Sequence, residues 1–193
     1  AIDEVFARVG AGLPAADAAR ALDAALAQHP IDRLPLANRP YAGLVSAYAM
    51  AGRADRATAI LNDYRRAWPD TAAMGWEITG LRSAQSALAI AERRWTDAAR
   101  FARHADSLPD GPAGDCEECL PRSLMFIFSE AGMADSAIAQ YQAYRRTPYG
   151  GRKREGPDVG LGGDLHERMA RAFEQKGDND RAAQLYRDMI ELW

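Results

Sequence analysis

The chain carries two cysteines, Cys116 and Cys119, in the stretch GDCEECLPR, and their close spacing suits three kinds of chemistry. A structural zinc site needs about four ligands, but His29, His104 and His166 are scattered singly and no second pair completes one. A redox dithiol is the second kind, because the N-terminus of a following helix lowers a thiol pKa, although flanking acidic residues raise it. A local disulfide, or a pair of half-buried free thiols, is the interpretation we favour.

The sequence contains none of the common catalytic motifs. There is no glycine-rich phosphate loop ahead of a lysine and Ser/Thr, no Gly-x-Ser-x-Gly elbow and no His-Glu-x-x-His helix. Acidic residues are plentiful, but most lie on polar helix faces, as at residues 178–180, and no acid/base pair stands out. We therefore expect a protein that is not an enzyme and needs no cofactor and no metal ion.

A cluster of basic residues could contact phosphate groups. It consists of Arg145, Arg146, Arg152, Lys153 and Arg154. The cluster falls around a glycine-rich stretch with Tyr149 as its aromatic residue, which is typical of a solvated loop. The net charge of -3 also argues against nucleic acid as a partner. No apolar run approaches the roughly 20 residues that span a bilayer, so we expect no membrane insertion.

The elements that position these residues are predicted to be helices, and residues 39–69 give the plainest pattern. In their first half, apolar residues recur at helical spacing: Leu44, Ala47, Tyr48 and Ala51. Gly52 can adopt a positive φ and end this helix. The periodicity resumes over residues 54–68 before Pro69 closes the segment. We therefore expect an antiparallel helical hairpin.

The hairpin recurs along the chain. A small residue marks the second helix of each repeat, at Ala18, Ala57, Ala98, Ala137 and Ala182, in steps of 39, 41, 39 and 45 residues. The repeats cover about residues 1–30, 38–69, 79–109, 118–148 and 163–193, the first being incomplete. In the third repeat, Arg93 stands where the others have a turn glycine. All five repeats together form the single domain that we expect.

Individual helices follow from the same register. The remaining ones are expected at residues 2–9, 15–28, 83–93 and 95–107, from Cys119 onward in the fourth repeat, and over residues 164–193, with a turn at 177–182. Residues 31–38 are expected to be a connector. Residues 70–80 are expected to be a linker that could add one helical turn.

The hairpin pattern resembles the tetratricopeptide repeat (TPR) family. The residues that carry the resemblance are Tyr41, Leu44, Tyr48, Gly52, Ala57, Leu61 and Pro69. Val45 departs from the pattern, where a small residue is usual, and this departure would push the paired helices slightly apart. The resemblance implies an all-α, right-handed superhelical solenoid. Its first helices would line a concave groove that holds an extended peptide or a partner's helix.

The resemblance also implies which side chains face the groove. They are Arg39, Ala42, Ser46 and Ala49, then Ser83, Ala87 and Ile90, then Arg122, Phe126 and Ser129, then Asp164, Glu167, Arg171 and Glu174. The Lys and Asn set with which some relatives clamp a C-terminal carboxylate is absent. A partly apolar trough from Ser46 to Phe126, with Arg122 and Arg171 at its deeper end, suits a segment with an apolar side chain and one carboxylate. In the alternative interpretation, Phe126 packs within the stack and the arginines are ordinary solvated charges.

These patterns predict a protein-interaction module that binds a protein or peptide and is a monomer or weak homodimer. The chain begins without Met and ends within an expected helix, so we expect a region of a longer regulatory or signalling protein. The cysteine pair ahead of Gly132 is similar to the repeat regions of bacterial serine/threonine kinases and transcriptional regulators. Two alternatives remain open, a scaffold that self-associates through its end helices and a thiol-based sensor. The cytoplasm is the expected compartment unless a membrane segment is attached.

Overall fold

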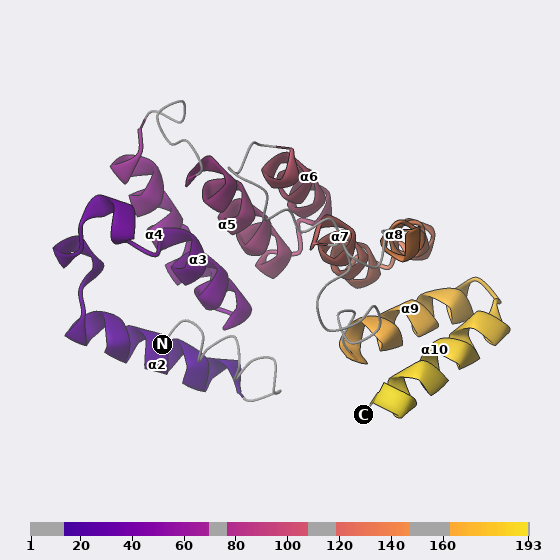
Figure 1. The fold of residues 1–193 in the computed structure, drawn as a ribbon. Coiled ribbons are helices and arrows are strands. Elements are labelled where there is room, and N and C mark those ends of the chain that lie inside the picture. Colours follow the sequence, from indigo (N-terminus) through magenta and orange to yellow (C-terminus); the bar gives the residue numbers. More distant parts are fainter. Residues whose placement is uncertain (1–13, 70–76, 108–118, 147–162, 193) are drawn as a thin grey trace. The chain divides into compact units, whose positions relative to one another are not determined.

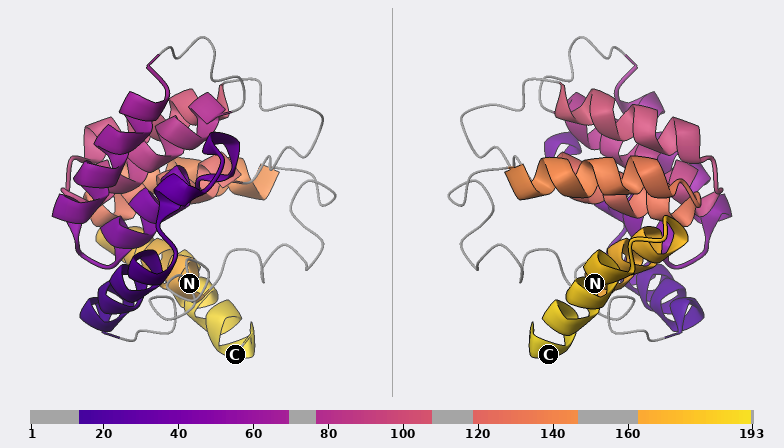
Figure 2. Two further views of the ribbon diagram at one scale, coloured as in Figure 1. Left: turned by 90° about the vertical axis from the view of Figure 1, so that its left-hand side faces the viewer. Right: turned by 90° about the vertical axis from the view of Figure 1, so that its right-hand side faces the viewer.

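The computed structural model describes residues 14–69, 77–107, 119–146 and 163–192. Within these ranges the regular secondary structure is helical and contains no strand (Figure 1), as Figure 2 shows from two further sides. The chain forms two compact units, residues 1–110 and 111–193, and we describe each by itself.

The first compact unit contains five α-helices and two short 3₁₀ helices in its described part. They are α2 (Ala15–Gln28), η1 (Ile31–Arg33), η2 (Leu36–Asn38), α3 (Tyr41–Met50), α4 (Ala54–Ala67), α5 (Glu77–Ala91) and α6 (Trp95–Asp106). The second compact unit contains two hairpins in its described part. Their helices are α7 (Cys119–Glu130), α8 (Ala134–Arg146), α9 (Gly163–Gln175) and α10 (Asn179–Leu192).

Most predicted helix bounds are confirmed to within a few residues, and one is wrong. Helix α2 has the predicted bounds of residues 15–28, whereas α5 begins at Glu77 and not at Ser83. The helical turn that the predicted linker could add is present at residues 77–80 and is continuous with the rest of α5. The helix expected at residues 2–9 lies outside the described residues.

The four described turns between paired helices share one backbone conformation. Gly52, Gly132 and Gly177 have φ values of 71°, 70° and 77°, and Arg93 has φ 58°. In each turn, the residue after the one with positive φ donates its N–H to the carbonyl of the residue five positions before it. The N–H of Arg94, for example, donates to the carbonyl of Ala89 at 2.8 Å. This bond satisfies a carbonyl that the helix end leaves free. The third repeat therefore makes the same turn as the others without a glycine.

The alanines that mark the repeats lie where each second helix meets its neighbours. Ala57, Ala98 and Ala137 are 0% exposed, Ala18 is 1% exposed and Ala182 is 2% exposed. A methyl group allows two helix backbones to approach closely, and a larger side chain at the same place would push them apart. The predicted register is confirmed at all five positions.

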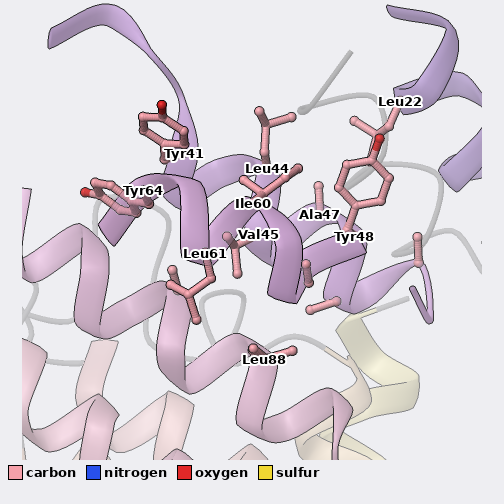
Figure 3. Close-up of a cluster of buried hydrophobic side chains, with 14 of the residues drawn as sticks. Leu22, Tyr41, Leu44, Val45, Ala47, Tyr48, Ile60, Leu61, Tyr64 and Leu88 are labelled. Atoms are coloured by element: carbon pink, nitrogen blue, oxygen red, sulfur yellow. The ribbon is translucent and has the colours of Figure 1, made fainter. Parts of the chain in front are cut away.

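The core of the first compact unit is built around α3 (Figure 3). The rings of Tyr41 and Tyr64 stack with their centroids 5.0 Å apart, and Val45 is fully buried. A Cβ placed on Gly80 would lie 3.2 Å from the hydroxyl oxygen of Tyr64. Glycine at this place in α5 therefore allows α5 to pack against the aromatic pair.

A polar network joins α2 to the hairpin that follows it. The buried hydroxyl of Tyr48 donates to Oδ1 of Asp23 at 2.6 Å, and the ring points toward Leu22 of α2 (Figure 3). Arg56 of α4 donates to the same oxygen at 3.1 Å. The half-exposed carboxylate thus accepts hydrogen bonds from two helices of the next hairpin.

Candidate partner-binding surface

We refer to the first helices of successive hairpins as the inner helices, because the family resemblance implies that they line a concave side. Helix α3 contacts α5, and α7 contacts α9. Across the described part of the chain these contacts are more extensive than any between second helices of successive hairpins. The curvature toward these first helices that the resemblance implies stays a prediction. The predicted groove residues belong to these inner helices, apart from Arg39, which precedes α3.

In the first compact unit, the predicted groove side chains differ in their burial and in their hydrogen bonds. Ser46 and Ala87 are half-buried, and Ser83 is exposed. Arg39 donates from Nε to the carbonyl of Leu34 at 3.0 Å and from Nη2 to that of Asp32 at 2.9 Å. Arg39 therefore holds the connector in place, and its role in binding stays a prediction.

In the second compact unit, the ring of Phe126 on α7 makes a cation–π contact. The guanidinium carbon of Arg168, on α9, lies 4.6 Å from the ring centroid. Arg168 also pairs with Glu130, one turn further along α7. The ion pair and the ring together fix the direction of the Arg168 side chain. Phe126 is half-buried and contributes both to the packing of α9 on α7 and to the inner surface.

The two predicted groove arginines of this unit have different surroundings. Arg171 is 66% exposed and pairs with Oε1 of Glu167, one turn earlier on α9, at 2.6 Å. Arg122 is half-buried, and its Nε is buried without a hydrogen-bond partner among the described residues. Arg171 is thus the more accessible cation of the two.

A pocket of about 220 Å³ opens between the end of α7, the start of α8 and one face of α9. Its lining residues are Ser129, Glu130, Gly132, Ala134, Arg168, Arg171, Ala172 and Gln175. The groove residues expected from the sequence include Ser129 and Arg171 but not Glu130, Arg168 and Gln175. Arg168 stands three residues before Arg171 on one helix face, a spacing that could have indicated a pair of cations.

The other candidate residues form no further site in the described part of the chain. Cys116 lies outside the described residues, and Cys119 begins α7 with a side chain that is not described, so the thiol hypotheses stay predictions. Among the described residues, no group of three or more His, Cys, Asp or Glu could hold a metal ion. Arg145 and Arg146 are exposed at the end of α8. No described helix is long and apolar enough to span a membrane.

Antiparallel helical hairpins with a left-handed turn residue and a buried alanine at each crossing define a class, the helical-repeat solenoid of TPR-like type. The chain matches the solved structure of MamA MSR-1 C2, a TPR-containing protein, with a TM-score of 0.54 and 17% sequence identity. The match covers 98% of this chain and 92% of that one. No family model matches the chain, and no curated protein sequence does. The prediction of an all-α solenoid is confirmed.

Proposed function

We propose that the chain is a protein-interaction module that binds an extended segment of a partner protein along its inner helices. One observation carries this proposal. Within each compact unit, the inner helices keep half-buried or exposed side chains of mixed chemistry: Ser46 and Ala87 in the first unit, and Phe126 and Arg171 in the second. Side chains that remain accessible on the curved-in side of a helical stack are suited to an extended ligand.

The chemistry of the surface supports a peptide more than a small molecule. Its apolar atoms come from small residues, Ile90 and the ring of Phe126, and its charges come from guanidinium groups and from carboxylates of α9. Such a surface can accept an apolar side chain and orient the partner through charge-assisted hydrogen bonds. A binding role within a larger regulatory or signalling protein is consistent with this arrangement and with the fold.

Selection of random-sequence peptides displayed on phage, with the full chain as bait, tests the proposal. Bound peptides are expected to slow amide hydrogen exchange in α3, α5, α7 and α9 more than in the second helices. The double variant Arg122→Glu/Arg171→Glu should keep its helical circular dichroism and lose the selected peptides. Arg187→Glu, on the exposed face of α10, is the matched control. Unchanged binding by the double variant would reject the groove assignment.

A second candidate function is self-association through α10. It is favoured by Ile190, which is 70% exposed on this end helix. Exposed apolar side chains at the end of a repeat stack are suited to packing against another helix. Sedimentation over a range of concentrations separates the two candidates, because a monomer at every concentration excludes the scaffold.

A further inference from the structure

The pocket beside α9 is smaller than a usual small-molecule site. Its volume of about 220 Å³ is below the range of about 300–1,000 Å³ that is usual for small-molecule sites. The lining carries two guanidinium groups, of Arg168 and Arg171, and one carboxylate, of Glu130. The charged lining therefore has a positive excess, which favours an anionic group.

Arg168 is the fixed cation of the pocket. Its ion pair with Glu130 and its position over the Phe126 ring hold the guanidinium from two sides. Its Nε lies 4.0 Å from Oδ2 of Asp164 and is buried without a hydrogen-bond partner among the described residues. A side chain held in this way loses little conformational freedom when a ligand arrives.

Arg171 is the cation that can change partners. Its ion pair with Glu167 is between side chains that are 66% and 45% exposed, and exposed pairs of this kind contribute little to stability. A carboxylate held by both nitrogens of the guanidinium fork, in a pocket that water reaches less easily, binds more strongly. Glu167 does not line the pocket, so within the free protein it acts as a weak substitute for a ligand.

We propose that this pocket binds one carboxylate side chain, Asp or Glu, of the partner segment, an inference that rests on the proposed function. Arg171 contacts the carboxylate directly, and the side-chain amide of Gln175 supplies a neutral donor beside it. Arg168 is a positioning residue that keeps the pocket open and positive. Glu167 competes with the ligand for Arg171.

Peptides selected on the full chain test this assignment. Asp or Glu should be enriched at one position, and changing that residue to Asn or Gln should weaken binding about tenfold or more. Arg171→Gln should cause the same loss for the acidic peptide and almost none for its amide counterpart. Glu167→Gln should strengthen binding of the acidic peptide, because it removes the competitor. Arg187→Gln, a control on α10, should change neither affinity.

The outcomes separate the pocket from the groove. Peptides that bind along the inner helices without an acidic residue, or that bind Arg171→Gln as well as the unmodified chain, would overturn the carboxylate pocket and leave the groove standing. Weaker binding after Glu167→Gln would also overturn it. If no peptide is selected, or if protection falls on the second helices, the proposed function itself fails.

Discussion

Arg93 adopts the same left-handed backbone conformation as Gly52 at the equivalent turn of the preceding hairpin, with φ values of 58° and 71°. An L-residue pays for this conformation because its Cβ approaches the following carbonyl oxygen, at a cost of roughly 1–2 kcal/mol. The turn persists because the neighbouring helices and the bond from Arg94 to Ala89 hold it. The third repeat is thus strained where the other described turns are relaxed.

Replacing Arg93 with glycine should stabilise the protein. Glycine removes the strain of the left-handed conformation. It also raises the conformational entropy of the unfolded chain, which reduces the gain in stability by about 0.4–1 kcal/mol. The expected net gain is about 0.5–1 kcal/mol in the free energy of unfolding, measured by urea denaturation. Gly132→Ala makes the reverse change at an equivalent turn and should destabilise, because alanine is strained at φ 70° even though its Cβ would meet no atom within 4 Å. A loss of stability in Arg93→Gly would contradict this account.

The hydrogen bond from Tyr48 to Asp23 should make stability depend on pH at both ends of the scale. Burial, and then the bond to Asp23, raises the pKa of Tyr48 from 10.0 to about 12. The pKa of Tyr48 is higher in the folded than in the unfolded protein. The contribution of Tyr48 to the free energy of unfolding is therefore complete below pH 10.0 and is lost as the pH rises toward about 12. The bond from Tyr48 lowers the pKa of Asp23 below 3.8, so that contribution is present above this pH and is lost in stronger acid.

Tyr48→Phe therefore tests the network between α2 and α3. The variant should lose about 1 kcal/mol at neutral pH, because a buried hydrogen bond disappears, and its stability should fall less steeply between pH 10 and 12. Urea denaturation at a series of pH values measures both effects. Tyr186→Phe is the comparison at a more exposed site, where burial and then the bond to Glu174 raise the pKa of Tyr186, and a smaller change of the same sign is expected. An unchanged alkaline slope in Tyr48→Phe would contradict the assignment.

The buried alanines should tolerate enlargement poorly. Ala137 is 0% exposed in α8, whereas Ala139, two residues further along the same helix, faces solvent. Leucine at position 137 overpacks the helix crossing and should cost about 1–3 kcal/mol, since interiors are close-packed. Leucine at position 139 should change the thermal midpoint little, because both residues favour helix. Equal midpoints for the two variants would mean that the alanine does not set the helix spacing.

Much of this fold could be predicted because its signals are local. The period of apolar residues, the glycines at three of the described turns and the repeated alanine each act over one or two helical turns, and they place the helices and the hairpins correctly. The error at α5 has a local cause too. Gly80 is the last residue of the predicted linker, but it lies inside α5, where its missing Cβ makes room for Tyr64.

By itself, the sequence determined that the chain is a series of antiparallel helical hairpins, because helix periodicity and turn conformation depend on residues close together along the chain. Only the tertiary structure decided that Arg168 joins Arg171 in a pocket, and that Asp23 accepts a hydrogen bond from Tyr48. Those relationships depend on distances across helix crossings, where a shift of one residue in register exchanges one neighbour for another. Packing sets that register, and packing depends on all the buried side chains together.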